Sequence, residues 1–166
     1  MHVQPGHFNW PCVNILTGWG DTYSTAGADA FEKAAIANDI KVCTKAKYDS
    51  GKGRVGVKKT IKEIITERCC RVTVVFPLGP DLIALLLEAH EQKYDGEWVV
   101  GDNVVDSLGA VVTNLKMELE KTQTKEMAES SVHKLMRGMY VCMYVCMCAC
   151  IALEESELLI SQSSKC

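Results

Sequence analysis

Apolar residues over about the first hundred positions follow two alternating patterns: short continuous runs, and longer stretches in which apolar side chains recur at helical spacing. The short runs are rich in β-branched residues and predict strands, whereas the longer stretches predict helices with one buried face. Strands are expected at Val13–Leu16, Ile40–Thr44, Arg71–Phe76 and Glu97–Val100, and helices at Tyr23–Asn38, Arg54–Arg68 and Pro80–Lys93.

The third strand and helix form the clearest unit. The run Arg71–Phe76 is long enough for a strand buried on both faces, and the segment from Pro77 to Pro80 ends it. Pro80 suits the first position of a helix, where no amide hydrogen is needed. Strands that alternate with helices of this length require βαβ crossovers, and hence parallel strands. The predicted fold class is α/β: a doubly wound open parallel sheet of three βα units plus a fourth strand, within residues 8–105.

The pattern weakens after Val105. Residues 106–137 read as a helical or irregular extension, and residues 154–166 as a tail. Between them, residues 138–153 contain the near-exact repeat MYVCMYVCMCAC, for which no globular element is needed. This segment carries no charge, but it is shorter than the roughly 20 residues of a spanning helix. It is compatible with a marginal membrane segment, or with a translated nucleotide repeat that transcript sequencing would reveal.

Composition limits the function classes. The chain has 166 residues, enough for one domain, with 48% apolar and 23% charged side chains and a net charge of −3. No dense basic stripe is present, so nucleic acid is not an expected partner. The first residues have neither a basic nor an apolar region, so no signal peptide is expected.

The nine cysteines do not have the spacing of a disulfide framework. Four of them, at positions 142, 146, 148 and 150, lack the paired spacing of a zinc site, and no bound metal is expected. Cys69 and Cys70 can be explained as small buried apolar residues. Pairing among Cys12, Cys43, Cys69 and Cys70 stays open.

Motifs for catalysis and cofactor binding are weak. The loop Gly18–Tyr23 lies between a strand and a helix, where a dinucleotide-binding loop would lie, but Tyr23 occupies the position of its third glycine. The chain has no phosphate loop, serine elbow or zinc-protease motif. His90 is expected on the solvent side of its helix. We therefore expect neither an enzyme nor a cofactor.

Several segments carry a family resemblance when they are taken together. The motifs are Asn9-Trp10, Val13–Leu16, Ala26–Phe31, Ile40–Cys43 and Gly96–Asp102, in this order and spacing. They resemble one lobe of the receptor-family ligand-binding region. This is the bilobed, type I periplasmic-binding-protein-like module of class C G-protein-coupled receptors, such as metabotropic glutamate receptors, and of receptor guanylyl cyclases. The likeness covers residues 8–105 and points to the second lobe.

The resemblance implies ligand-binding residues. Tyr23 matches the family tyrosine that packs on the ligand, with Ser24 beside it, and Asp102 matches the acidic residue that receives an amino group. Leu78 stands where amino-acid-binding relatives can carry a polar or acidic side chain, which argues against glutamate-like specificity. Each residue also has a purely structural explanation: Tyr23 could cover the start of its helix, and Asp102 could cap a turn.

The function expected from the resemblance is that of a fragment of an extracellular ligand-sensing domain of a membrane receptor. A small, amino-acid-like ligand would bind between this lobe and a first lobe that this chain does not contain, and the parent receptor would form a homodimer. The alternatives are a solute-binding protein that serves a transporter, a Rossmann-type nucleotide-dependent enzyme, and a non-functional fragment.

Overall fold

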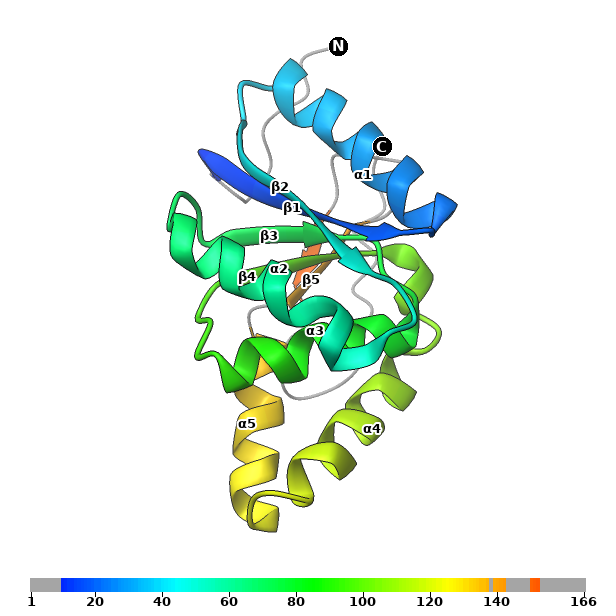
Figure 1. Ribbon diagram of the computed structural model, residues 1–166, viewed down its shortest axis with the longest axis vertical. Coiled ribbons are helices and arrows are strands. Elements are labelled where there is room, and N and C mark those ends of the chain that lie inside the picture. The colour runs from blue at the N-terminus through cyan, green and yellow to red at the C-terminus, as the bar shows by residue number, and fades with distance from the viewer. Residues whose placement is uncertain (1–9, 138, 143–149, 153–166) are drawn as a thin grey trace.

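A parallel sheet of four strands forms the centre of the molecule, as the strand and helix pattern predicts (Figure 1). The computed structural model describes residues 10–137, 139–142 and 150–152. The strand order is β2-β1-β3-β4, and two further strands, β5 and β6, extend the sheet beyond β4. In chain order the elements are β1 (Cys12–Trp19), α1 (Thr22–Ala37), β2 (Lys41–Asp49), α2 (Gly53–Glu67), β3 (Val72–Val75), α3 (Gly79–Glu91), β4 (Glu97–Gly101), the 3-10 turn η1 (Asp102–Val104), α4 (Leu108–Glu120), α5 (Lys125–Arg137), β5 (Met139–Cys142) and β6 (Cys150–Ala152).

The helices cover both faces of the sheet, which makes the fold doubly wound. Helix α1 packs on one face, over apolar side chains such as Ile15 and Val74. Helices α2 and α3 pack on the opposite face, over side chains such as Leu16 and Val75 (Figure 1). Adjacent residues of β1 and β3 thus point to opposite faces, and both faces are buried. The α/β fold class predicted from the sequence is confirmed.

Phe76 fixes the position of α1 against the sheet. Phe76 follows the last residue of β3. A Cβ atom added at Gly27 of α1 would stand 2.6 Å from its ring, and one added at Gly101 of β4 would stand 2.7 Å from it. Only glycine at these positions lets the ring occupy this space. The start of α1 and the end of β4 therefore meet around one buried aromatic side chain.

The second strand is longer than its apolar run suggests. We expect a strand only as far as Thr44, but β2 continues to Asp49. Lysines occupy alternate exposed positions of this continuation, whereas Ala46 and Tyr48 are buried. Since β2 is an edge strand of the sheet, exposed lysines there oppose pairing with another chain.

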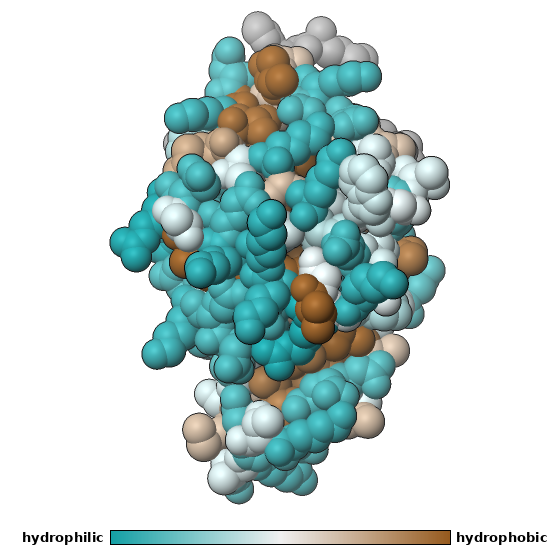
Figure 2. Space-filling model, in the orientation of Figure 1, coloured by the Kyte–Doolittle hydropathy of each residue, from teal (hydrophilic) through white to brown (hydrophobic). Residues whose placement is uncertain are grey.

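Helices α4 and α5 occupy the region expected to be helical or irregular. They form an antiparallel pair that extends away from the sheet and packs on α3 (Figure 1). The space-filling view shows a mainly hydrophilic face with small apolar areas, one of them a band above this helix pair (Figure 2).

The Met/Tyr/Val/Cys repeat contributes strands. Met139–Cys142 pairs in parallel with β4, and Cys150–Ala152 pairs in antiparallel with β5. The sequence does not need a globular element here, but these residues form strands, because tyrosine, valine and cysteine suit a strand and β4 offers an open edge. The tail 154–166 and the other residues of the repeat lie outside the described residues.

Two disulfides lie at the end of the sheet where its parallel strands begin. Cys12 at the start of β1 bonds to Cys70, and Cys43 of β2 bonds to Cys69. The adjacent cysteines lie between α2 and β3, so one short segment holds two neighbouring strands. The interpretation of Cys69 and Cys70 as simple apolar residues is wrong, because the fold brings partners 58 and 26 positions distant into contact with them.

Candidate functional site at the carboxyl edge of the sheet

The carboxyl ends of the parallel strands meet at the edge opposite the disulfides. The chain passes from β1 to β2 on one side and then returns to β3 on the other side of β1. In open α/β sheets, ligands bind at this reversal, beyond the carboxyl ends of the two diverging strands. The loops β1–α1 and β3–α3 flank the reversal here, and the turn after β4 lies next to them.

Hydrogen bonds hold these loops in place. The amide of Gly18 donates to Oγ of Ser24 over 2.8 Å, which ties the end of β1 to the first turn of α1. The side-chain amide of Asn103 donates to the carbonyl of Pro77 over 2.7 Å, which joins the loop after β3 to the turn after β4. The β1–α1 connection is therefore held within itself, and the loops after β3 and β4 are joined to each other.

Asp21 caps helix α1. Its Oδ1 accepts hydrogen bonds from the amides of Tyr23 and Ser24, at 2.9 Å and 3.2 Å. Gly20 precedes it with a φ of +81°, a conformation that glycine adopts without strain. Because the carboxylate already occupies these two amides, the helix start does not offer them to a phosphate. This geometry disfavours the nucleotide-binding alternative.

Four residues were predicted to contact a ligand, and all lie in segments that follow carboxyl strand ends. Tyr23 is half-buried and packs against the apolar side chains beneath α1. Leu78 is 51% exposed and immediately precedes α3. Asp102 begins the turn after β4, and its side chain lies outside the described part of the structure. Ser24 is fully buried, with its hydroxyl engaged by Gly18, so its observed role is to hold the loop.

Three buried polar atoms near the β1–α1 loop make no hydrogen bond of good geometry: the hydroxyl of Tyr48, Oδ2 of Asp21 and Oγ1 of Thr17. The Tyr48 hydroxyl lies against Gly18, where a Cβ atom would stand only 3.1 Å from it. Buried polar groups are normally hydrogen-bonded, so these atoms are exceptions to the usual pattern. Sequence analysis missed Tyr48; the alternation of lysines with Ala46 and Tyr48 in β2 was the available signal.

The environment of Tyr48 keeps its phenol neutral. Burial raises the pKa of Tyr48 far above its ordinary value of 10.0, and the nearby Asp81 and Asp21 carboxylates raise it further, whereas the Ser24 hydroxyl lowers it. The hydroxyl is thus a neutral donor beneath the loop at any physiological pH.

Large apolar side chains are exposed at the same edge. Trp19 ends β1, Val55 lies in the first turn of α2, and Leu78 precedes α3; they are 64%, 87% and 51% exposed. These positions follow β1, β2 and β3 in turn, so apolar surface accompanies the polar loops along the edge.

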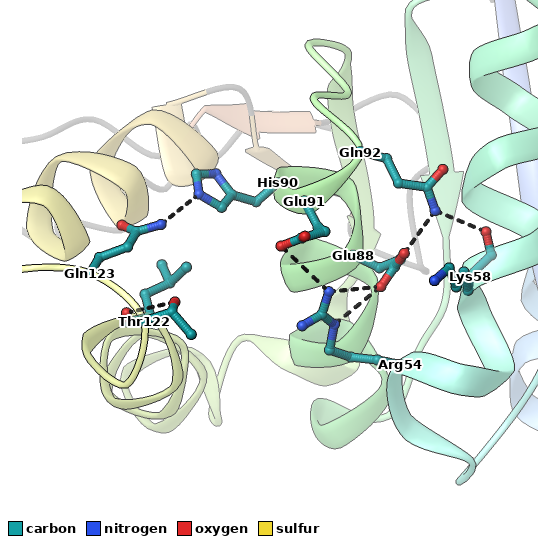
Figure 3. A network of polar contacts seen from close by, with 9 residues as sticks. Arg54, Lys58, Glu88, His90, Glu91, Gln92, Thr122 and Gln123 are labelled. Atoms are coloured by element: carbon teal, nitrogen blue, oxygen red, sulfur yellow. Dashed lines mark hydrogen bonds and ion pairs between the residues drawn. The ribbon is translucent and has the colours of Figure 1, made fainter.

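Buried carboxylates brace the helices that support this edge. Asp81 accepts hydrogen bonds from the Ser50 hydroxyl and the Gly51 amide, at 2.6 Å and 2.9 Å, and so holds the β2–α2 loop against α3. Glu88 of α3 accepts from Arg54 of α2 through Nε and Nη2, at 3.1 Å and 2.9 Å (Figure 3). These contacts join α2 to α3 beside the site.

Figure 3 also shows contacts of α3 with α2 and with the α4–α5 connection. Gln92 links Glu88 to the carbonyl of Lys58, and Nε2 of His90 lies 3.0 Å from Nε2 of Gln123 in the α4–α5 connection. His90 is half-buried rather than solvent-facing as predicted, because this connection packs over α3.

Metal and membrane sites find no support in the described residues. Within residues 10–137, 139–142 and 150–152, no three histidine, cysteine or carboxylate side chains gather to hold a metal ion. No helix in these ranges has the length and apolar content that a membrane span requires. The side chains of the four cysteines between positions 142 and 150 lie outside the described part of the structure. No known protein-family model matches the chain.

Proposed function

We propose that this chain is one lobe of an extracellular ligand-sensing domain, and that its carboxyl edge forms half of a site for a small, amino-acid-like ligand. The observation that carries the proposal is the gathering of the loops of Tyr23, Leu78 and Asp102 at the reversal of the strand order.

The disulfides support an extracellular location. Structural disulfides persist in oxidising compartments and are rare in the reducing cytosol. Cys12–Cys70 and Cys43–Cys69 join strand ends that are far from the candidate site, so their role is to hold the sheet.

Signalling in this proposal works by closure, with no bond chemistry. A first lobe on another part of the parent protein would approach the edge that exposes Trp19, Val55 and Leu78. A ligand that contacts both lobes favours the closed form by its difference in affinity for the two forms. The lone lobe supplies only half of the contacts, so we expect it to bind ligands weakly. In the parent receptor we propose a homodimer that transmits closure to a membrane effector.

Saturation-transfer NMR on the full chain tests the ligand class. The probes are neutral, acidic and basic L-amino acids at millimolar concentration. We expect saturation to be transferred from the protein to a neutral amino acid with an apolar side chain, because Leu78 lies at the carboxyl ends of the strands. Tyr23→Ala should abolish the signal, whereas Ile36→Ala, an exposed residue at the other end of α1, should retain it. Equal signals from both variants, or none from any amino acid, would refute the proposal.

A further inference from the structure

The Cys43–Cys69 disulfide borders a hollow on the surface of the molecule. The hollow, of about 550 Å³, lies between the second half of α1 and the first half of β2, and Cys43 forms part of its wall together with Ile36 and Ile40. At the other end of the bond, Cys69 is exposed in the connection from α2 to β3. Both ends of this disulfide are therefore open to a molecule in solution.

The Cys12–Cys70 disulfide lies deeper. Cys70 is only 8% exposed and belongs to the apolar cluster beneath α1, and Cys12 packs against the same cluster. Cys43 also packs against this cluster, but unlike Cys12 and Cys70 it borders the hollow. In thiol–disulfide exchange the attacking thiolate must reach a sulfur atom, so the rate depends on access. The adjacent residues Cys69 and Cys70 thus hold two bonds that differ in their access to a thiol.

Arginines flank the adjacent cysteines in the chain. Arg68 precedes Cys69 and forms no ion pair with a described residue, whereas Arg71 shares its charge with Asp95, 3.3 Å away. Positive charge beside a cysteine stabilises its thiolate, and a more stable thiolate leaves a disulfide faster. This favours Cys69 as the sulfur that leaves and Cys43, in the wall of the hollow, as the sulfur that is attacked.

We propose that Cys43 is a thiolation site, at which a low-molecular-weight thiol of the glutathione class exchanges with the Cys43–Cys69 disulfide. The thiolate attacks Sγ of Cys43 from the hollow and forms a new sulfur–sulfur bond with it. The Cys43–Cys69 bond breaks at the same time, and its electron pair leaves on Sγ of Cys69 as a thiolate. The exchange consumes one thiol and needs no other oxidant or reductant.

Thiolation changes the edge of the sheet and leaves the core cross-linked. It adds a group of peptide size to the hollow beside β2, which is an edge strand. Cys12–Cys70 still joins β1 to the segment that precedes β3. The thiolation site lies where the parallel strands begin, opposite the candidate ligand site, so this proposal does not rest on the proposed function.

Reduced glutathione and the folded, oxidised full chain test the site. After acid quenching and alkylation, peptide mass spectrometry locates adducts, free thiols and remaining disulfides. Among the four bonded cysteines we expect glutathione on Cys43, a free thiol at Cys69 and an intact Cys12–Cys70 bond. Loss of Cys12–Cys70 should be at least about tenfold slower, because its buried sulfur is reached only after local opening. In urea-unfolded protein the two bonds should react at rates within about threefold of each other, since access is then equal.

Two pairs of variants locate the path of attack. Ile36 is 63% exposed, so its substitution leaves the core intact. Ile36→Glu puts a negative charge in the hollow and should slow thiolation about two- to threefold relative to its neutral match, Ile36→Gln. Arg68→Gln should slow thiolation by a similar factor, because it removes positive charge beside the leaving sulfur. Lys59→Gln removes a charge from the exposed face of α2 and should leave the rate unchanged.

Three outcomes would overturn the thiolation site. They are glutathione on Cys69 with a free thiol at Cys43, equal reaction rates of the two disulfides in the folded protein, and no exchange until the protein unfolds. Equal rates for Ile36→Glu and Ile36→Gln would exclude attack through the hollow.

Discussion

The amide of Gly18 donates a hydrogen bond of 2.8 Å to the hydroxyl of Ser24, and this contact joins β1 to α1 at the candidate site. The hydroxyl is fully buried, so Ser24→Ala would leave the Gly18 amide without its partner. We expect a loss of about 1–3 kcal/mol in the free energy of unfolding, measured with urea.

Thr25→Ala is the matched control for Ser24→Ala. The Thr25 hydroxyl is exposed and donates to the carbonyl of Asp21, so its removal should change the unfolding free energy by less than about 0.5 kcal/mol. Equal effects of the two substitutions would show that the Gly18 contact does not hold the loop.

Substitution of two glycines by alanine should change the free energy of unfolding in opposite directions. At Gly27 a Cβ atom would stand 2.6–3.0 Å from the ring of Phe76, so Gly27→Ala forces buried groups apart. We expect a loss of about 1–3 kcal/mol, despite the better helix propensity of alanine. At Gly109 in α4 a Cβ atom meets nothing within 4 Å, and Gly109→Ala should stabilise the protein by about 0.5–1 kcal/mol. Thermal and urea unfolding of both variants measure the contrast, and a stabilised Gly27→Ala would contradict the packing around Phe76.

Each disulfide should contribute strongly to stability. Cys12–Cys70 spans 58 positions and Cys43–Cys69 spans 26. The entropy that such cross-links remove from the unfolded chain stabilises the folded protein by about 4 kcal/mol and about 3.5 kcal/mol, respectively. Replacing Cys12 and Cys70 by alanine, or Cys43 and Cys69, should lower the unfolding free energy by amounts of this order. Free thiols at these four positions in the folded, air-oxidised protein would exclude both bonds; alkylation and mass spectrometry detect them.

Tyr48 should make stability depend on alkaline pH. Burial raises the pKa of its phenol in the folded protein above the value of 10.0 expected when unfolded. Below about pH 10 both states keep the proton; above it the unfolded chain ionises first, so the unfolding free energy falls as pH rises. Tyr48→Phe should remove this part of the decline, and at pH 7 it should change the unfolding free energy by no more than about 1 kcal/mol, since the hydroxyl makes no hydrogen bond of good geometry.

Urea unfolding between pH 7 and pH 11 measures the effect as the difference between the two proteins. Tyr94, whose pKa burial also raises, is present in both, so its contribution cancels. A constant difference across this range would mean that the Tyr48 phenol is not shielded from water in the folded state.

Local pattern was enough to predict the central sheet. The β-branched run of β3, the helical spacing of α2 and the proline at the start of α3 each determine their element with little help from tertiary contacts. The end of β2 was missed because its alternating lysines read as a polar loop, while the partner strand β1 holds them extended. Sequence could not join Cys12 to Cys70, because that contact depends on how β1 and β3 pair.

The candidate site was predictable only in outline. Loops at carboxyl strand ends follow from the fold class, and they bring the segments of Tyr23, Leu78 and Asp102 to one edge. The engagement of Ser24 with Gly18, and the unpaired hydroxyls of Thr17 and Tyr48, depend on atomic positions that residue types do not specify.

The most direct measurement of the central claim is a two-dimensional ¹⁵N–¹H NMR map of the full chain titrated with a neutral, apolar L-amino acid such as leucine. Our account predicts concentration-dependent shifts that gather at residues 19–24, 77–79 and 101–104, on the carboxyl edge of the sheet. Shifts centred on the disulfide-linked amino edge, or no shifts at millimolar concentration, would contradict it.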